Sequence, residues 1–228
     1  MTINELAQTK MSEGLAYLIG LLYPLLTDKK EIVDKFHNRK YIGGNVNHNE
    51  VSVEDIAAHF NSVLKLFANC NLTNIIIKNN KKDPAQKKDF SCSSKMGFTC
   101  LVETTGVGIN NTESILKKKV QEIEVADIDT RKAFVRGFFD GRGSWDNTLH
   151  MFSVDVDRNP SRTRWLQKIC ESVIGDGSVQ LNLRESNHPK NDQMRIRKNY
   201  LRRFLTSVGL FSVARKDILE NHVMKLGL

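Results

Sequence analysis

The stretch Phe134–Asp146, FVRGFFDGRGSWD, constrains the fold more than any other part of this sequence. Val135, Phe138 and Phe139 recur at helical spacing and predict a helix with one apolar face. Gly137 lies inside this helix, where a glycine costs roughly 1 kcal/mol relative to alanine. We therefore expect a second backbone to approach the helix closely at that point. An ordinary amphipathic core helix with a glycine-rich end would show the same apolar pattern.

A second glycine in a similar setting lies near the start of the chain. Ser12 is suited to cap a helix from Glu13 to about Leu22, which is apolar on nearly all sides. Gly20 lies inside this helix and precedes Gly137 by 117 positions. The two segments thus open the first and second parts of the chain in the same manner.

The segment VRGFFDGRG, residues Val135–Gly143, resembles the signature helix of the LAGLIDADG homing endonucleases. The fitting positions are Val135, Gly137, Phe138, Phe139, Asp140, Gly141 and Gly143. The segment Leu18–Leu26 is similar to a degenerate second copy, in which Leu18, Gly20, Leu21 and Leu22 fit. The eighth position, where active members carry a metal-binding acid, holds Arg142 in one copy and Leu25 in the other.

This resemblance implies an α+β fold with two pseudo-symmetric αββαββα halves that form a DNA-binding saddle. We place the first half at residues 1–120 and the second at 121–228. The two signature helices would pack through Gly20 and Gly137. The expected state is a monomer with an internal pseudo-twofold axis, which binds double-stranded DNA.

Periodicity predicts most of the elements that such halves need. In the first half we predict a helix at Val53–Asn69, strands at Thr73–Lys78 and Gly97–Thr104, and a short helix at Thr112–Val120. We interpret Thr27–Tyr41 as irregular, Gly43-Gly44 as a turn, Lys81–Lys95 as a basic loop and Gln121–Asp129 as a linker. In the second half, Asp129 or Thr130 would cap the central helix. We then predict strands at Leu149–Val156, Val179–Arg184 and Gln193–Lys198, and helices at Pro160–Ile174, Asn199–Val208 and Val213–Met224.

The last two strands alternate strictly, which predicts one buried face and one polar face. The inward set is Val179, Leu181, Leu183, Met194 and Ile196, and the outward set is Gln180, Asn182, Arg184, Arg195 and Arg197. Arginine pairs with guanine in the major groove, and glutamine or asparagine pairs with adenine. Exposed strand faces are polar in proteins without DNA partners too, so alternation alone leaves both interpretations open. Further candidates for DNA contact are Lys198, Arg142, Lys216, Arg162, Arg164 and the lysines of Lys78–Lys95.

Cleavage of DNA with Mg²⁺ needs carboxylates beside the scissile phosphates. The resemblance assigns this place to Leu25 and Arg142, and neither side chain holds Mg²⁺. Arg142 is better suited to bind a phosphate. The nearby acids Asp28, Asp140 and Asp146 could form a displaced catalytic site with Mg²⁺, although Asp140 could equally cap or pack a helix.

Composition agrees with a nucleic-acid partner. The formal net charge is +8, which favours a polyanion as partner. Four cysteines without a CxxC pair argue for free thiols in a reducing compartment. No apolar run is long enough for a membrane span, so we expect an intracellular protein without a membrane partner.

Three functions remain open at this point. The first is sequence-specific DNA binding by a homing-endonuclease-like protein with impaired cleavage. The second is an active Mg²⁺-dependent double-strand endonuclease with displaced acids. The third is an RNA-binding helper of intron splicing, as some members of the family are.

Overall fold

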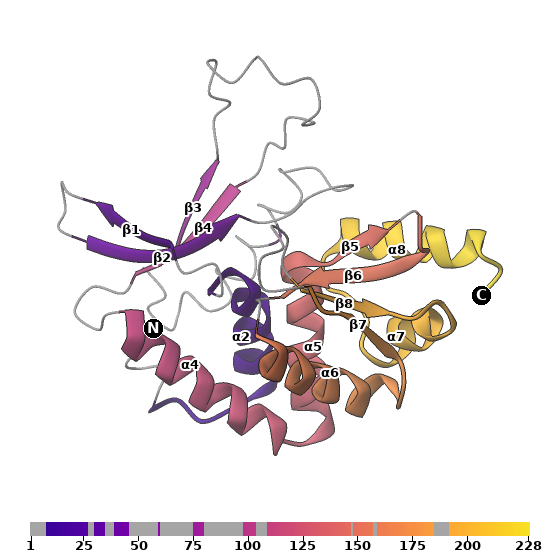
Figure 1. Ribbon diagram of the computed structural model, residues 1–228, viewed down its shortest axis with the longest axis horizontal. Coiled ribbons are helices and arrows are strands. Elements are labelled where there is room, and N and C mark those ends of the chain that lie inside the picture. Colours follow the sequence, from indigo (N-terminus) through magenta and orange to yellow (C-terminus); the bar gives the residue numbers. More distant parts are fainter. Residues whose placement is uncertain are drawn as a thin grey trace, which may run out of the picture.

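The computed structural model describes residues 8–26, 30–34, 39–45, 59, 75–79, 98–103, 109–146, 148–156, 159–184 and 192–228. Two helices lie at its centre, α2 (Glu13–Leu26) and α5 (Ile128–Arg142), with one four-stranded antiparallel sheet on each side of them (Figure 1). Mixed helices and antiparallel sheets confirm the predicted α+β content. In the described part, no helix is both long and apolar enough to cross a membrane.

The first sheet contains β1 (Lys30–Asp34), β2 (Arg39–Asn45), β3 (Ile75–Asn79) and β4 (Phe98–Glu103) in the order β1-β2-β4-β3. The predictions for β3 and β4 are confirmed. Two predictions are wrong: Thr27–Tyr41 contains strand rather than only irregular chain, and Gly43-Gly44 is no turn. The glycines lie inside β2 opposite Leu101 and Cys100, where ladder pairing of the backbone overrides their turn preference.

The second sheet contains β5 (Ser144–Asp146), β6 (Met151–Asp155), β7 (Val179–Asn182) and β8 (Gln193–Ile196) in the order β5-β6-β8-β7. Relative to its own first strand, each sheet therefore has the same strand order. Phe152, Val154, Met194 and Ile196 are buried on one face of the second sheet, as alternation predicts. Leu183 does not join them and is 38% exposed, because β7 ends one residue earlier, at Asn182.

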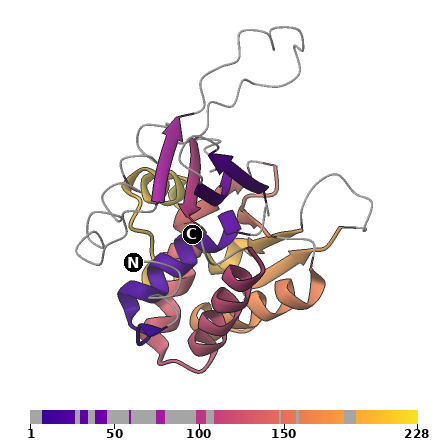
Figure 2. The same cartoon turned by 90° about the vertical axis from the view of Figure 1, so that its left-hand side faces the viewer.

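The remaining helices are α4 (Ile109–Glu124), α6 (Pro160–Ile174), α7 (Leu201–Ser207) after the 3-10 turn η3 (Lys198–Tyr200), and α8 (Val213–Lys225). Figure 2 shows α2, α4, α5 and α6 gathered on one side, with the strands beyond them. Leu166, Ile169 and Val173 of α6 are buried, as its periodicity predicts.

Helix boundaries near the middle of the chain differ from the prediction. α4 continues to Glu124 because Val120 and Ile123 are buried, so only residues 125–127 separate it from α5. The helix cap of α5 is Asp127, whose side chain accepts a hydrogen bond from Thr130 N, and not Asp129 or Thr130. α2 also runs further than expected, through Pro24. The predicted helix Val53–Asn69 lies outside the described residues except for His59, which is helical.

Candidate nucleic-acid interface

α2 and α5 touch through their glycines. A Cβ built at Gly20 would meet the Phe134 carbonyl oxygen and lie 2.9 Å from Phe138 N. A Cβ built at Gly137 would meet the Tyr17 carbonyl oxygen and lie 2.9 Å from Leu21 N. Neither backbone leaves room for a side chain at these points.

The two helices run in the same direction. Tyr17 lies against Gly137, and Leu21, one turn later, lies against Gly141, where a Cβ would be 2.5 Å from the Leu21 carbonyl oxygen. Their C-terminal ends therefore lie on the same side of the pair. Leu25 and Arg142, the residues in the family's acid positions, occupy these last turns.

The C-terminal end of α5 is rich in buried cationic groups. Arg142 is its last residue and is 9% exposed, and Arg215 of α8 is 4% exposed. Arg215 donates a hydrogen bond to the Gly143 carbonyl oxygen, just beyond the helix. Burial lowers the pKa of Arg215 to about 10, which still leaves it charged at neutral pH. A cation at this place is stabilised by the negative end of the helix dipole, and it would repel a metal ion.

Asp140 is buried inside this region, with an exposure of 0%. Its Oδ2 accepts hydrogen bonds from Tyr17 OH at 2.8 Å and from Phe211 N at 2.9 Å. Its Oδ1 accepts a hydrogen bond from Ser212 N at 3.1 Å. Burial raises the pKa of Asp140, whereas the nearby His59 and these donors act in the opposite direction. The carboxylate thus satisfies two backbone N–H groups directly before α8.

Tyr17 links Asp140 to His59. The Tyr17 hydroxyl lies 2.8 Å from His59 Nε2, and since it donates to Asp140, His59 Nε2 is the donor in this second contact. Burial lowers the pKa of His59, so the neutral ring is favoured. Burial and the adjacent carboxylate raise the pKa of Tyr17. This series of hydrogen bonds thus connects α2, through Tyr17, with α5, through Asp140.

Of the other two candidate acids, only Asp146 belongs to the described residues. Asp146, in β5, accepts hydrogen bonds through Oδ1 from Thr148 N and Leu149 N, both at 3.0 Å. It therefore shapes the β5–β6 turn. Asp28 lies outside the described residues. Within the described ranges, no three His, Cys, Asp or Glu side chains gather to hold a metal ion.

The polar face of the second sheet brings together four of the predicted DNA-contact residues, Gln180, Asn182, Arg184 and Arg195. Arg195 of β8 lies between Ser153 of β6 and Gln180 of β7, and Gln193 lies between Asp155 and Asn182. Arg195, Gln180 and Asn182 are half-buried. Asp155, which alternation also places outward, thus shares this face.

These side chains bond to one another along the face. Asp155 Oδ1 accepts from Gln193 Nε2 at 2.9 Å, and Gln193 Oε1 accepts from Arg195 Nη2 at 2.7 Å. In the amide orientation that satisfies both neighbours, Asn182 Oδ1 accepts from Arg195 Nη2 at 2.9 Å and from Arg184 Nη2 at 3.0 Å. The face is therefore an ordered network of donors rather than a set of independent side chains.

Three other candidate contacts lie off this network. Arg197 and Lys198 follow β8 and are exposed. Lys216 is exposed on α8, and its Nζ lies 3.7 Å from Oε1 of Glu220, one turn along the helix. Such a pair contributes little to stability.

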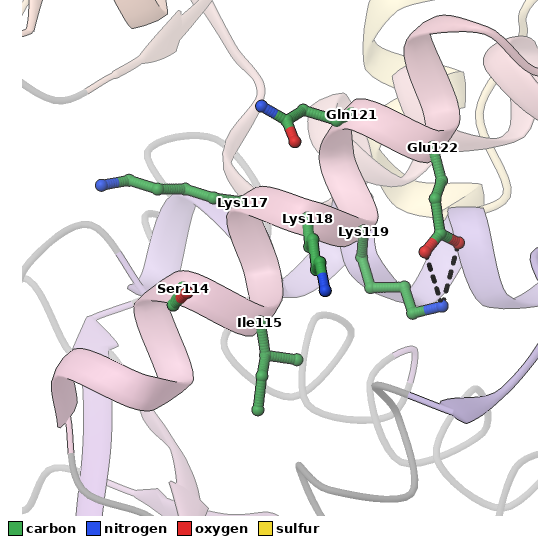
Figure 3. A pocket seen from close by; sticks show the side chains of 7 residues that line it. All are labelled: Ser114, Ile115, Lys117, Lys118, Lys119, Gln121 and Glu122. Carbon is green, nitrogen blue, oxygen red and sulfur yellow. Dashed lines mark hydrogen bonds and ion pairs between the residues drawn. The ribbon is translucent and has the colours of Figure 1, made fainter.

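A cavity of about 350 Å³ opens beside α4 (Figure 3). Among its described lining residues, Lys119 is buried, and it donates to Glu122 and to the Thr9 carbonyl oxygen. Lys117 and Lys118 are exposed along the same helix. None of the residues predicted for the site belongs to this described lining.

Sequence reasoning missed several members of the site. Gln193 is two positions before Arg195 on an alternating strand, so its outward position was available from the pattern. Tyr17, His59 and Arg215 gave no such signal, because their partners are distant in sequence.

No protein-family model matches the sequence, and no curated protein matches it. Solved structures do match over most of the chain. I-DmoI in complex with DNA and Ca aligns with a TM-score of 0.55 at 16% identity, covering 93% of this chain and all of that one. I-DmoI in complex with DNA and Mn aligns with a TM-score of 0.54 at 16% identity, covering 88% of this chain and 98% of that one. The N-terminal LAGLIDADG domain of DUF199/WhiA aligns with a TM-score of 0.51 at 14% identity, covering 91% of this chain and 89% of that one.

These similarities agree with the paired helices and the two antiparallel sheets. The chain has the fold of the LAGLIDADG homing endonucleases. The resemblance found in Val135–Gly143 is therefore confirmed at the level of the fold.

Proposed function

We propose that this protein binds double-stranded DNA sequence-specifically, with the polar face of its second sheet against the DNA, and has lost the cleavage chemistry of its fold. The observation that carries the proposal is the polar face of β5-β6-β8-β7, where Gln180, Asn182, Arg184 and Arg195 lie together. Such side chains bond to base edges in the major groove. Both I-DmoI structures reported above contain DNA, which supports the same partner here.

Two observations support a saddle with pseudo-symmetric halves. Each sheet has the same strand order relative to its own first strand, and the contacts of Gly20 and Gly137 are reciprocal. A monomer with an internal pseudo-twofold axis would place one sheet on each half of a long site. Since the two signature segments differ in sequence, the proposed site is not palindromic.

The loss of cleavage rests on the chemistry at the helix ends. Leu25 offers no ligand atom, and Arg142 carries a positive charge where the family places an acid. Asp140 already accepts hydrogen bonds on both oxygens. The described residues therefore do not fit Mg²⁺, and we derive no metal-dependent step from them. The Arg142 guanidinium suits a phosphate oxygen instead.

The test is a selection from randomised duplex DNA, performed once with Mg²⁺ and once with EDTA, in which bound and cut molecules are both sequenced. The proposal expects enriched sequences under both conditions and no Mg²⁺-dependent cuts. Defined cuts that need Mg²⁺ would overturn the loss of cleavage and lead to Asp28→Asn and Asp146→Asn variants. Stronger binding to structured RNA than to any duplex would overturn the choice of DNA.

A further inference from the structure

Arg184 and Arg195 share one amide, but they are not equivalent. Arg195 Nη2 donates to two acceptors, Gln193 Oε1 at 2.7 Å and Asn182 Oδ1 at 2.9 Å. An Nη group carries two hydrogens, so both are used inside the protein. Arg184 Nη2 donates only to Asn182, at 3.0 Å, within the described part of the chain. One Nη2 hydrogen and the Nη1 group of Arg184 therefore remain for a ligand.

The backbone of Arg184 is fixed as well. Its N–H donates to Asp192 Oδ1 at 2.7 Å, and Asp192 is 1% exposed. The carbonyl oxygen of Asp192 accepts from Val156 N at 2.8 Å, directly after β6. Arg184 is thus held at its main chain by the end of the sheet and at its guanidinium by Asn182.

Two parallel N–H groups on one guanidinium match the O6 and N7 acceptors of guanine. An arginine that is already held in place loses less conformational freedom when it binds. Arg184 meets both conditions, whereas Arg195 meets only the second because its Nη2 is occupied. Asp155 reinforces this arrangement, since it orients Gln193, which holds Arg195.

We propose that Arg184 selects one guanine in the DNA under the second sheet, and that Arg195 is a positioning residue that holds Arg184 through Asn182. This inference rests on the proposed DNA-binding function and deepens it. The acceptor of Asn182 is occupied by the arginines, so this residue does not present the acceptor–donor pair that reads adenine. Gln180, opposite Arg195, keeps its amide for that purpose in the described structure.

The experiment compares full-length variants in the duplex selection, followed by titration of the enriched sequence and of single-base changes in it. The wild-type protein is expected to prefer guanine at one position by about tenfold or more. Arg184→Lys keeps the charge and loses the paired donors, so the preference at that position alone should disappear. Asn182→Ala should weaken the same preference. Asn182→Asp keeps an acceptor for both arginines and should retain the preference with lower affinity for all sequences.

Arg202→Lys is the matched control, because Arg202 is exposed on α7 and is not a candidate for DNA contact. It should leave the base preference unchanged. If wild-type protein binds duplexes but Arg184→Lys keeps the same base preference at every position, the role of Arg184 is refuted while DNA binding stands. If Asn182→Ala leaves the preference intact, the positioning role is refuted. If wild-type protein enriches no duplex at all, the proposed function fails and this inference fails with it.

Discussion

Gly20 and Gly137 meet their partner helices in the same way. Each lies against the carbonyl group of the residue three positions before the other, Phe134 for Gly20 and Tyr17 for Gly137. The obstructing atoms belong to backbone, which cannot rotate away as a side chain does. Close packing of α2 and α5 therefore depends on the absence of a side chain at both positions.

We expect Gly137→Ala to destabilise the protein by about 3 kcal/mol or more, because the added Cβ forces the helices apart. Urea unfolding followed by circular dichroism measures the change. Gly177→Ala is the matched control, since a Cβ there meets no atom within 4 Å and only the positive φ of 71° is strained. That control should lose about 1 kcal/mol. Equal losses in the two variants would contradict the close approach.

Asp140→Asn tests the structural role of the buried carboxylate. In asparagine, an amide nitrogen would replace one of the two carboxylate oxygens. It would then face either the Ser212 N–H or both Tyr17 OH and the Phe211 N–H. Because the amide nitrogen donates and cannot accept, at least one hydrogen bond is lost. We expect a loss of about 2–5 kcal/mol in the free energy of unfolding. Asp146→Asn is the control, because its single accepting oxygen survives as the amide carbonyl. A stable Asp140→Asn variant would argue against a structural role.

His59 should make stability depend on pH. Burial lowers its folded-state pKa below the unfolded value of about 6.5. Between these two values the unfolded chain binds more protons, so the free energy of unfolding falls as pH decreases through this window. The raised pKa of Asp140 has the opposite effect, because above the unfolded-state pKa of aspartate it makes the free energy of unfolding fall as pH rises. The contribution of His59 is therefore measured by comparison with a variant that lacks only the histidine.

His59→Gln provides that comparison, since the amide nitrogen of glutamine donates to Tyr17 OH as the ring does. We expect the stability difference between wild type and His59→Gln to favour wild type less at pH 5 than at pH 7.5. Denaturant unfolding at both pH values measures it. A difference that does not change with pH would show that His59 titrates alike in the folded and unfolded chain.

The Cys170 thiol should be inert in the folded protein. Its exposure is 0%, and burial raises its pKa, so little thiolate is present to react. Iodoacetamide labelling followed by mass spectrometry of the peptide that contains Cys170 should show modification only after denaturation. Rapid labelling in native buffer would contradict this burial.

The second half of the chain was largely predictable because each of its elements buries one clear face. Val179 and the pair Met194 and Ile196 mark the core side of β7 and β8, and the helix at Pro160 begins as predicted. The prediction that Leu183 points inward was wrong, because alternation does not show where a strand leaves the core. In the first half, β1 and β2 carry charged residues and a glycine pair, so it is their pairing with each other and of β2 with β4 that makes them strands.

The candidate site was predictable only where it follows a local pattern. Arg195 and Gln180 share a face by alternation, and the sheet register brings them opposite each other. Asp140 contacts the chain before α8, 72 positions away at Ser212, and such a contact leaves no periodic signal. The bond from Arg184 N to Asp192 likewise depends on how β7 and β8 are joined.

Arg142→Gln tests whether the residue in the acid position now serves DNA binding. Arg142 is the last residue of α5, so a phosphate at this helix end would meet its guanidinium group if DNA follows the sheets. Loss of one charged contact should lower duplex affinity by about tenfold and reduce the slope of log affinity against log salt by about 1. Fluorescence anisotropy at several salt concentrations measures both quantities.

Arg142→Lys is the matched variant for this test, since it keeps the charge and loses the planar guanidinium. Its salt slope should equal that of wild type, with an affinity between those of wild type and Arg142→Gln. Thermal unfolding of both variants separates a binding effect from a loss of fold, because Arg142 is nearly buried. If Arg142→Gln folds normally and keeps the wild-type affinity and salt slope, Arg142 makes no phosphate contact, and its charge instead serves the C-terminal end of α5.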